Sequence, residues 1–377
     1  MNAEALHIII SGGGTGGHVF PALAIAEALH EIDPQINILF VGAAGRMEMQ
    51  KVPEAGYRIV GLPVAGLQRR ITWKNLLVPY KLLKSIRQSK KILREFKPDV
   101  AVGVGGYASG PVLRAAGKKG IPVLIQEQNS YAGVTNRLLA RRAQKICVAY
   151  DGMEKYFPAD KIAITGNPVR KNLTSLADKK AEGLAHFHLN TNRKTLLVIG
   201  GSLGARSINE TMIQHLDAFK NKDIQLIWQC GRNYYQQALD KLHAVDLPNI
   251  RLKDFISRID LAYAASDLII SRAGAGTISE LALIKKPVIL VPSPNVAEDH
   301  QTRNARSLVK INAAILVKDQ EVREKLIDQA FKILDDDQKR NALSANIARI
   351  AKPDSAKKIA ESIMQLAKTS KSSKQGL

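Results

Sequence analysis

The chain has 377 residues, 45% of them hydrophobic, which is enough for two domains of roughly 100–200 residues that each bury a core. Only two cysteines occur, Cys147 and Cys230, which excludes a disulfide framework, gives no metal-ligand spacing and favours a reducing compartment. The formal net charge of +21 favours an anionic partner. The start shows no basic segment followed by an apolar one, and no apolar run approaches ~18 residues, so we expect neither a signal peptide nor a membrane span.

Apolar runs and segments of helical spacing alternate along the first half of the chain. Strands are predicted at 7–11, 36–41, 99–104, 122–126 and 145–149. The Ala- and Leu-rich stretch 19–30 is predicted as a helix. This alternation is typical of an α/β fold built from βαβ units, in which helices cover a parallel sheet.

The alternation breaks near residue 168 and then restarts. Gly166-Asn167-Pro168 has turn chemistry, and 171–194 is polar and without a predicted strand. Further strands are predicted at 195–199, 224–229, 250–253, 268–270 and 288–291. We therefore expect domains at 1–167 and 168–352, a helix at about 353–368 that packs back on the first domain, and a disordered Lys/Ser-rich tail at 369–377.

Each half opens with a strand that runs into a glycine-rich turn and then a helix. The turns lie at 12–17 and 200–204. A helix N-terminus offers unpaired N–H groups and a positive dipole end, and glycine lets a phosphate approach the backbone. Two such turns, each opening its own sheet, predict two Rossmann-like domains that bind ligands at the carboxyl ends of their strands.

The first turn formally satisfies the dinucleotide pattern GxGxxG with Gly12, Gly14 and Gly17. An NAD enzyme also needs an acid at the end of the second strand, and 41–46 has no carboxylate. The sequence has no P-loop motif either. Both cofactor classes are therefore disfavoured.

A third glycine turn follows the predicted strand at 268–270 and leads into a helix. Thr277 and Glu280 have the spacing of a capping box, so one interpretation is that they cap this helix. The other is that the turn faces a diphosphate while Glu280 accepts the hydroxyls of a ribose. The pattern alone leaves both open.

Basic residues concentrate at 67–97, with ten Lys/Arg and one acid, and at 137–145. Apolar residues are interleaved with the first cluster. Three interpretations stay open: a solvated helix face, a peripheral membrane patch whose cations face anionic headgroups, and a nucleic-acid surface. The predicted membrane patch comprises Ile71, Trp73, Leu76, Leu77, Tyr80, Arg141 and Arg142.

Six motifs in order resemble those of the MurG family, the bacterial transferases that make lipid II. They are GGTGGHVFP at 13–21, GGYASGP at 105–111, EQN at 127–129, GNPVR at 166–170, GGSLGAR at 200–206 and RAGAGTISE at 272–280. The resemblance covers nearly the whole chain. It implies a two-domain GT-B fold and transfer of N-acetylglucosamine from UDP-N-acetylglucosamine to the muramyl 4-hydroxyl of lipid I, at the cytoplasmic face of the inner membrane.

The resemblance also implies roles for individual residues. Glu280 would hold the ribose, Ser202 and Arg170 the diphosphate, and Ile256 the uracil. The residues implied for the donor site are Thr15, Gly16, Gly17, Asn129, Arg170, Ser202, Ile256, Arg272, Ala275, Gly276, Thr277, Glu280, His300, Gln301 and Asn304. Those implied for the acceptor site are Gly14, Thr15, His18, Tyr107 and Asn129. Some relatives have two glutamines where this chain has His300-Gln301, so the role of His300 stays open.

The implied reaction is a single inverting displacement at the anomeric carbon. His18 is the leading general-base candidate because its pKa class suits neutral pH, with a plain hydrogen-bonding role equally open and Glu127 as the alternative base. No DxD motif follows a strand, and Asp335-Asp336-Asp337 lies at a polar helix end, so we expect neither a cofactor nor a catalytic metal.

The expected partners are UDP-N-acetylglucosamine, lipid I, an anionic phospholipid surface and cell-wall or division proteins, and not nucleic acid. Two alternatives are a UDP-N-acetylglucosamine 2-epimerase, which shares fold and donor, and a non-catalytic nucleotide-sugar-binding scaffold.

Overall fold

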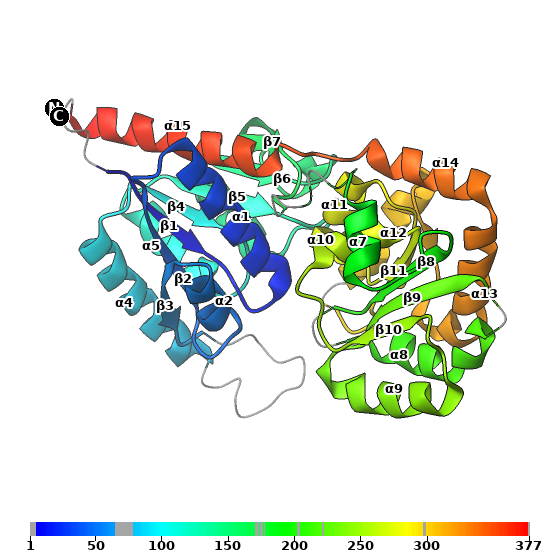
Figure 1. Cartoon of the computed structure of the whole chain (residues 1–377). Coiled ribbons are helices and arrows are strands. Elements are labelled where there is room, and N and C mark those ends of the chain that lie inside the picture. The colour runs from blue at the N-terminus through cyan, green and yellow to red at the C-terminus, as the bar shows by residue number, and fades with distance from the viewer. Residues whose placement is uncertain are drawn as a thin grey trace. The chain divides into compact units, whose positions relative to one another are not determined.

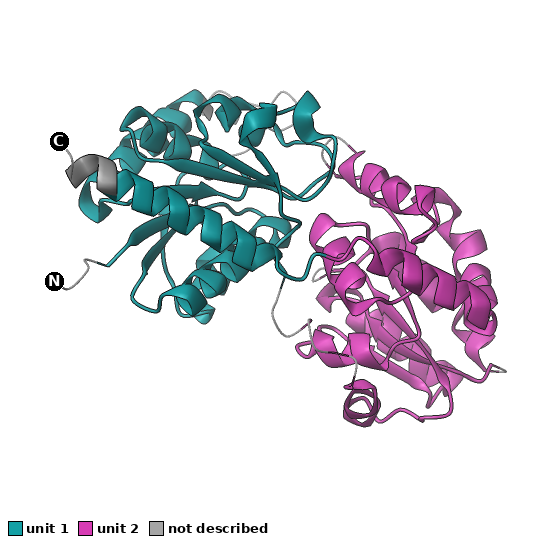
Figure 2. Ribbon diagram, turned by 90° about the horizontal axis from the view of Figure 1, so that it is seen from above, with its two compact units in different colours: residues 1–170, 352–377 teal, residues 171–351 magenta. Residues whose placement is uncertain are grey.

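Two compact units make up the computed structural model of the chain (Figures 1 and 2). The structure describes residues 5–64, 78–169, 173, 176, 178–201, 204–220, 222–296 and 299–375. Unit 1 comprises residues 1–170 and 352–377, and unit 2 comprises residues 171–351. The units divide after residue 170, whereas the sequence analysis placed the junction after residue 167.

Unit 1 is built on a seven-stranded sheet in the order β3-β2-β1-β4-β5-β6-β7, with every neighbouring pair parallel. The strands are β1 (His7–Ser11), β2 (Asn37–Ala43), β3 (Arg58–Leu62), β4 (Val100–Gly103), β5 (Val123–Glu127), β6 (Lys145–Val148) and β7 (Ile162–Ile164). The order reverses between β1 and β4, and such switch points are where open parallel sheets bind ligands at their carboxyl edge. The predicted parallel α/β architecture is confirmed.

Helices cover both faces of this sheet, which explains why its central strands read as continuous apolar runs. On one face Ile8 and Ile10 pack with α1 (Gly16–Ile32) and α15 (Ser355–Gln375). On the other face Ile9 packs with α4 (Val78–Phe96) and α5 (Ser109–Lys118). Two short helices, α2 (Glu48–Glu54) and α6 (Val134–Leu139), follow β2 and β5 in the chain.

The C-terminal helix α15 packs on α1, with Ile359, Ile363 and Ala367 fully buried. Their spacing of four residues places them on one face of the helix. The helix continues to Gln375, so the expectation of a disordered tail is wrong for 369–375. The segment contains Lys and Gln, which are good helix formers, and lysines near a helix C-terminus complement its dipole.

Unit 2 contains a six-stranded parallel sheet in the order β10-β9-β8-β11-β12-β13. Its strands are β8 (Lys194–Ile199), β9 (Ile224–Gln229), β10 (Ile250–Lys253), β11 (Leu268–Ser271), β12 (Val288–Leu290) and β13 (Ile315–Leu316). Its longer helices are α7 (Lys180–His186), α8 (Arg206–Gln214), α9 (Arg232–Val245), α10 (Ile259–Ala265), α11 (Ala275–Ile284), α12 (His300–Lys310), α13 (Val322–Asp335) and α14 (Asp337–Ala348). Two apolar clusters fill the two faces of the sheet.

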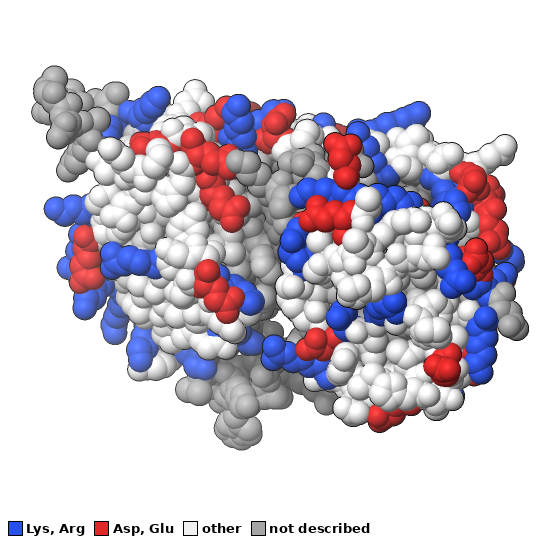
Figure 3. Space-filling view, viewed as in Figure 1, with Lys and Arg blue, Asp and Glu red and all other residues white. Residues whose placement is uncertain are grey.

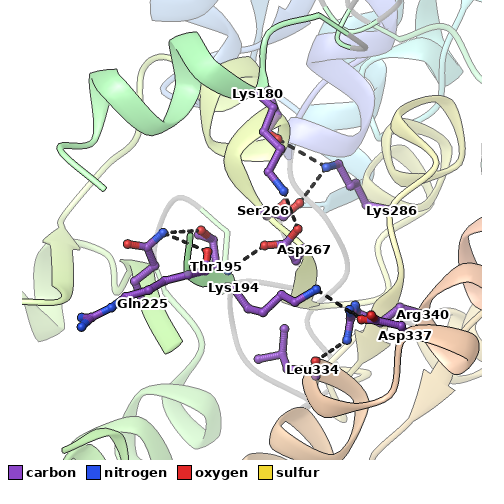
Figure 4. A network of polar contacts seen from close by, with 12 residues as sticks. Lys180, Lys194, Thr195, Gln225, Ser266, Asp267, Lys286, Leu334, Asp337 and Arg340 are labelled. Carbon is purple, nitrogen blue, oxygen red and sulfur yellow. Dashed lines mark hydrogen bonds and ion pairs between the residues drawn. The ribbon is translucent and has the colours of Figure 1, made fainter. Parts of the chain in front are cut away.

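A polar network holds the amino ends of β8 and β11, at the edge of the sheet opposite the glycine turns (Figure 4). Asp267 accepts hydrogen bonds from the Thr195 amide at 2.8 Å and from Lys180 Nζ at 2.7 Å. Lys286 donates to the Ser266 carbonyl at 2.7 Å, and burial lowers the pKa of its ammonium group. These contacts tie α7 and α10 to the sheet.

Among the described helices, none combines the length and apolar character that crossing a membrane requires.

Candidate functional site

The glycine turn between β11 and α11 presents a helix N-terminus at the carboxyl edge of the unit 2 sheet. The helix begins at Ala275 with Gly274 as its N-cap residue, so Thr277 is its third residue. A capping box would require Thr277 at the N-cap, so that interpretation is wrong. A Cβ atom added to Gly276 would meet no protein atom within 4 Å, so this glycine faces open space. The turn can therefore admit an anionic group close to its amides.

Glu280 lies one turn into α11 and is half-buried. The hydroxyl of Tyr263 in α10 donates to Glu280 Oε2 at 3.1 Å, and the Tyr263 side chain is itself 1% exposed. This contact fixes the orientation of a carboxylate near the open turn, which suits it to accept hydrogen bonds from the hydroxyls of a bound sugar. Tyr263 carried no signal in the sequence beyond its place in an apolar helix.

Arg272 precedes this turn and is committed to protein partners. Its guanidinium pairs with Asp319 at 2.5 Å and donates to the carbonyl oxygens of Val291 and Pro292 at 3.1 and 3.3 Å, and to Ser207 Oγ at 3.0 Å. These partners come from the ends of β12, from α8 and from the 3₁₀ turn Asp319–Glu321. Arg272 thus joins three elements at the carboxyl edge of the sheet.

The turn between β8 and α8 is held from behind by Gln229 at the end of β9. Gln229 Nε2 donates to the Gly201 carbonyl at 3.0 Å, and its Oε1 accepts the Ile256 amide at 3.0 Å. Ile256 is 5% exposed, and its N–H, in the segment predicted to read uracil, is engaged within the protein. Ser202 and Arg170, both predicted to hold the diphosphate, lie outside the described residues.

Helix α12 supplies two predicted sugar-binding residues with different surroundings. Gln301 Oε1 accepts the Ser293 amide at 2.8 Å, and the side chain is half-buried. Asn304 is fully buried and donates to the Ala273 carbonyl at 3.4 Å, directly behind the β11–α11 turn. In this geometry Asn304 supports the turn rather than facing outward. His300, the first residue of α12, is half-buried.

In unit 1 the turns after β1 and β4 pack against each other around His18. The backbone of Gly105 runs so close to the His18 ring that an added Cβ would lie 2.8 Å from Nε2. Thr15, the N-cap residue of α1, has its Oγ1 at 3.4 Å from His18 Nδ1. Tyr107, which follows the second turn, is 59% exposed. The structure therefore brings three of the predicted acceptor residues to one edge of unit 1.

Glu127, the alternative base, points into its own loop. The carboxylate is 2% exposed and accepts four N–H donors: the Asn129 amide and Nδ2 at 3.1 and 3.3 Å, the Gly133 amide at 3.0 Å and Asn136 Nδ2 at 2.8 Å. Burial raises the pKa of the carboxyl above its usual range, against these donors, which lower it. These hydrogen bonds hold the loop between β5 and α6 in place, and one of them occupies the Asn129 side chain.

Buried amide side chains support the same edge of unit 1, and the sequence analysis gave none of them a role in the site. Gln126 Nε2 donates to Asn167 Oδ1 at 3.0 Å, Asn167 Nδ2 to the Gln128 carbonyl at 3.0 Å, and Gln128 Nε2 to the Val104 carbonyl at 2.7 Å. This network joins the ends of β4 and β5 to the turn after β7.

Of the predicted membrane patch, Tyr80, Arg141 and Arg142 are exposed. The other members, Ile71, Trp73, Leu76 and Leu77, lie outside the described residues.

Comparison with known proteins covers both units. The glycosyltransferase family 28 N-terminal domain matches residues 8–148, and the glycosyltransferase family 28 C-terminal domain matches residues 195–363. A relative from Bacteroides thetaiotaomicron is 59% identical over 366 residues, covering 97% of this chain and 98% of the relative. A relative from Flavobacterium psychrophilum is 50% identical over 374 residues, covering 98% and 100%. Both are named UDP-N-acetylglucosamine–N-acetylmuramyl-(pentapeptide) pyrophosphoryl-undecaprenol N-acetylglucosamine transferase.

Solved structures of other proteins are similar to this chain over nearly its whole length. MurG of Acinetobacter baumannii superposes with a TM-score of 0.76 at 29% identity, covering 96% of this chain and 99% of that one. The UDP-GlcNAc 2-epimerase of Neisseria meningitidis reaches a TM-score of 0.67 at 15% identity, covering 96% and 100%, which indicates a shared fold alone.

Two Rossmann-type units with glycine turns at the carboxyl edges of their sheets define a glycosyltransferase of the GT-B fold. The chain belongs to the MurG family.

Proposed function

We propose that this protein transfers N-acetylglucosamine from UDP-N-acetylglucosamine to the 4-hydroxyl of the muramyl sugar of lipid I, forming lipid II. The names of the relatives that match 97–98% of the chain support the reaction. The observation in the structure that carries the donor assignment is the pairing of an open helix N-terminus at Gly276 with Glu280, whose carboxylate Tyr263 orients.

In the proposed step the acceptor oxygen attacks the anomeric carbon on the face opposite UDP. The new C–O bond forms as the bond to the diphosphate breaks, and the electron pair leaves with UDP. The amides at the start of α11 and the positive end of its dipole stabilise the departing diphosphate. We assign Glu280 to the ribose, and by family resemblance Ser202 and Arg170 to the diphosphate. We expect no requirement for a divalent cation.

Unit 1 is the proposed acceptor unit. The first amides of α1, from Gly16 and Gly17, have no partner within a helix. The resemblance implied these two glycines for the donor site, but we assign them to the lipid-linked diphosphate, because they open the helix of the acceptor unit. His18, in the first turn of the same helix, is the proposed base that takes the proton of the attacking hydroxyl. Glu127 is less suited to that task, because its carboxylate is buried and already accepts four N–H donors.

An exposed apolar and basic surface on unit 1 supports docking of the protein on an anionic membrane. Tyr80, Leu82 and Leu83 on α4 are 63%, 47% and 60% exposed, and Leu138 on α6 is 72% exposed. Both α4 and α6 lie with α5, and Lys and Arg side chains line the α4 edge (Figure 3). A lipid-linked acceptor would be reached from such a surface, with each cation near anionic headgroups contributing about 1 kcal/mol.

The reaction is tested by incubating the purified protein with UDP-N-acetylglucosamine and a short-chain lipid I analogue, with and without EDTA. We expect a disaccharide product and equal rates in both conditions. Formation of UDP-N-acetylmannosamine without transfer would instead support an epimerase. Nucleotide-sugar binding without turnover would support a scaffold, and loss of transfer in EDTA would contradict the metal-independent step.

Gly276→Ala should have opposite effects on the stability of the protein and on its affinity for UDP. Alanine at this helical position should raise the free energy of unfolding by roughly 0.5–1 kcal/mol. Its methyl group would occupy the space proposed for the diphosphate, so UDP affinity by calorimetry should fall about tenfold, a loss of about 1.4 kcal/mol. Gly117→Ala in α5 is the matched control, because its Cβ would meet only ordinary contacts at 3.5 Å or more. Unchanged UDP affinity in Gly276→Ala would contradict the donor assignment.

His18→Ala should lower the turnover number by about 100-fold or more if His18 is the general base. His18→Gln keeps a hydrogen-bonding group but cannot act as a base near neutral pH, so its turnover should fall as far. Steady-state kinetics with both substrates measure this. A near-normal turnover number with a raised acceptor KM in both variants would assign His18 to acceptor binding instead.

Replacing Leu83 and Leu138 together by Glu should reduce binding to vesicles that contain phosphatidylglycerol, while UDP affinity stays unchanged. The charges oppose both the insertion of apolar side chains and the attraction to anionic headgroups. Ile32→Glu is the control, because Ile32 is 40% exposed at the end of α1, on the other face of the sheet. Equal vesicle binding by the double variant and the control in co-sedimentation would reject this surface.

A further inference from the structure

A buried carboxylate lies behind the first glycine turn. Glu48 is the first residue of α2, five residues beyond the end of β2, and its side chain is 1% exposed. Carboxylates are rarely buried to this degree unless hydrogen bonds or charges compensate the lost hydration. The partners of Glu48 therefore indicate why the fold keeps it there.

Those partners are backbone amides of two adjacent strand ends. The Gly14 amide donates to both oxygens, at 3.0 Å to Oε1 and 2.9 Å to Oε2, and the Ala43 amide donates to Oε1 at 2.9 Å. Because β1 pairs with β2 in parallel, with Ser11 beside Val41, the segments beyond these residues leave the sheet side by side. The carboxylate joins the turn after β1 to the end of β2.

The Glu48 side chain also explains why residues 13 and 42 are glycines. A Cβ added to Gly13 would collide with the Glu48 carboxylate, and one added to Gly42 would lie 2.6 Å from Glu48 Cγ. Gly14, in contrast, has φ +90° and would meet nothing within 4 Å. Glu48 thus occupies the inner side of the turn and leaves the outer side open.

The Gly14 amide is taken by Glu48, and the Gly12 amide donates to the Val41 carbonyl at 3.3 Å. The predicted acceptor contact of Gly14 would therefore not use its N–H. The amides that remain for an anion are the first ones of α1, at Gly16 and Gly17. Hydrogen bonds to an ionised carboxylate are about twice as strong as neutral ones, so they suit the task of fixing a glycine-rich segment.

We propose that Glu48 is a positioning residue that holds the first glycine turn in the shape in which α1 receives the acceptor diphosphate. The identity of the ligand rests on the proposed function. The shape of the turn rests only on the contacts that Glu48 makes. Glu48 touches the turn and not the reacting atoms, so its loss should act on the acceptor and spare the donor.

Glu48→Ala should lower kcat/KM for the lipid I analogue by about 100-fold, because displacing a binding group by about 1 Å costs that much. The KM for UDP-N-acetylglucosamine should stay within about twofold of the wild-type value in the same assays. Glu48→Gln should lose only about tenfold, because its Oε1 can still accept the Gly14 and Ala43 amides. The control is Glu54→Gln on the same helix, where the carboxylate is exposed and pairs with Lys51 at 2.6 Å.

Hydrogen exchange by mass spectrometry tests the shape of the turn without any substrate. Exchange in a peptide spanning residues 12–18 should accelerate in Glu48→Ala and stay at the wild-type rate in Glu54→Gln. Wild-type exchange in Glu48→Ala, or equal loss of acceptor and donor kinetics, would overturn the proposal. If the wild-type protein transfers no sugar, the proposed function fails, whereas the exchange result still decides whether Glu48 holds the turn.

Gly42→Ala offers a second route should Glu48→Ala fold poorly. Its added methyl group pushes against Glu48 Cγ, so the single variant should mimic a partial loss of Glu48. Its effect on acceptor kinetics should shrink when Glu48 is already alanine, because the closest contact, at Glu48 Cγ, is then gone and only Ile59 Cδ1 at 3.1 Å remains. Additive effects in the double variant would contradict the proposed contact.

Discussion

The turns that leave the carboxyl ends of the strands depend on hydrogen bonds from buried side chains behind them. Backbone groups in these turns are satisfied neither by the sheet nor by the following helix, and an unpaired buried group is costly. In each unit a buried side chain supplies the missing partner, from a neighbouring element or, for Glu127, from the end of the preceding strand. These side chains are Glu48, Glu127, Gln229 and Asn304. With the inner side of these turns fixed in this way, open space remains beside Gly14, Gly201 and Gly276.

The glycines of the turns fall into two groups with different physical reasons. Gly106 and Gly204 are required by the protein itself, because added Cβ atoms would collide with backbone atoms of Gly13 and Cys230. Gly14, Gly201 and Gly276 would meet nothing within 4 Å. Gly14 and Gly201 have positive φ, which favours glycine by itself, but Gly276 is helical, so open space for a ligand is the better reason for its glycine.

At the carboxyl edge of unit 2, the charge of Arg272 is paired within the protein. Arg272 pairs with Asp319, and both are largely buried. The proposed binding of an anion by this unit would therefore depend on backbone amides and the α11 dipole more than on this cation. The net charge of +21 is expressed instead on exposed surfaces such as the α4 edge, where long-range attraction to an anionic surface needs no specific pairing.

The alternation of strands and helices, the two glycine-rich turns and the family could all be read from the amino-acid sequence. The predicted bounds of β1, β9 and β10 match the structure. The first is an apolar run, whereas β10 alternates apolar and charged residues. The sequence analysis missed β3, β7 and β13, which are short or partly exposed and lie at or near sheet edges. Only the tertiary structure decided which side chain holds which turn. Glu48 lies 34 residues from Gly14, and Gln229 lies 28 from Gly201. Such pairs depend on strand order and register, which bring distant segments together and leave no local pattern to read.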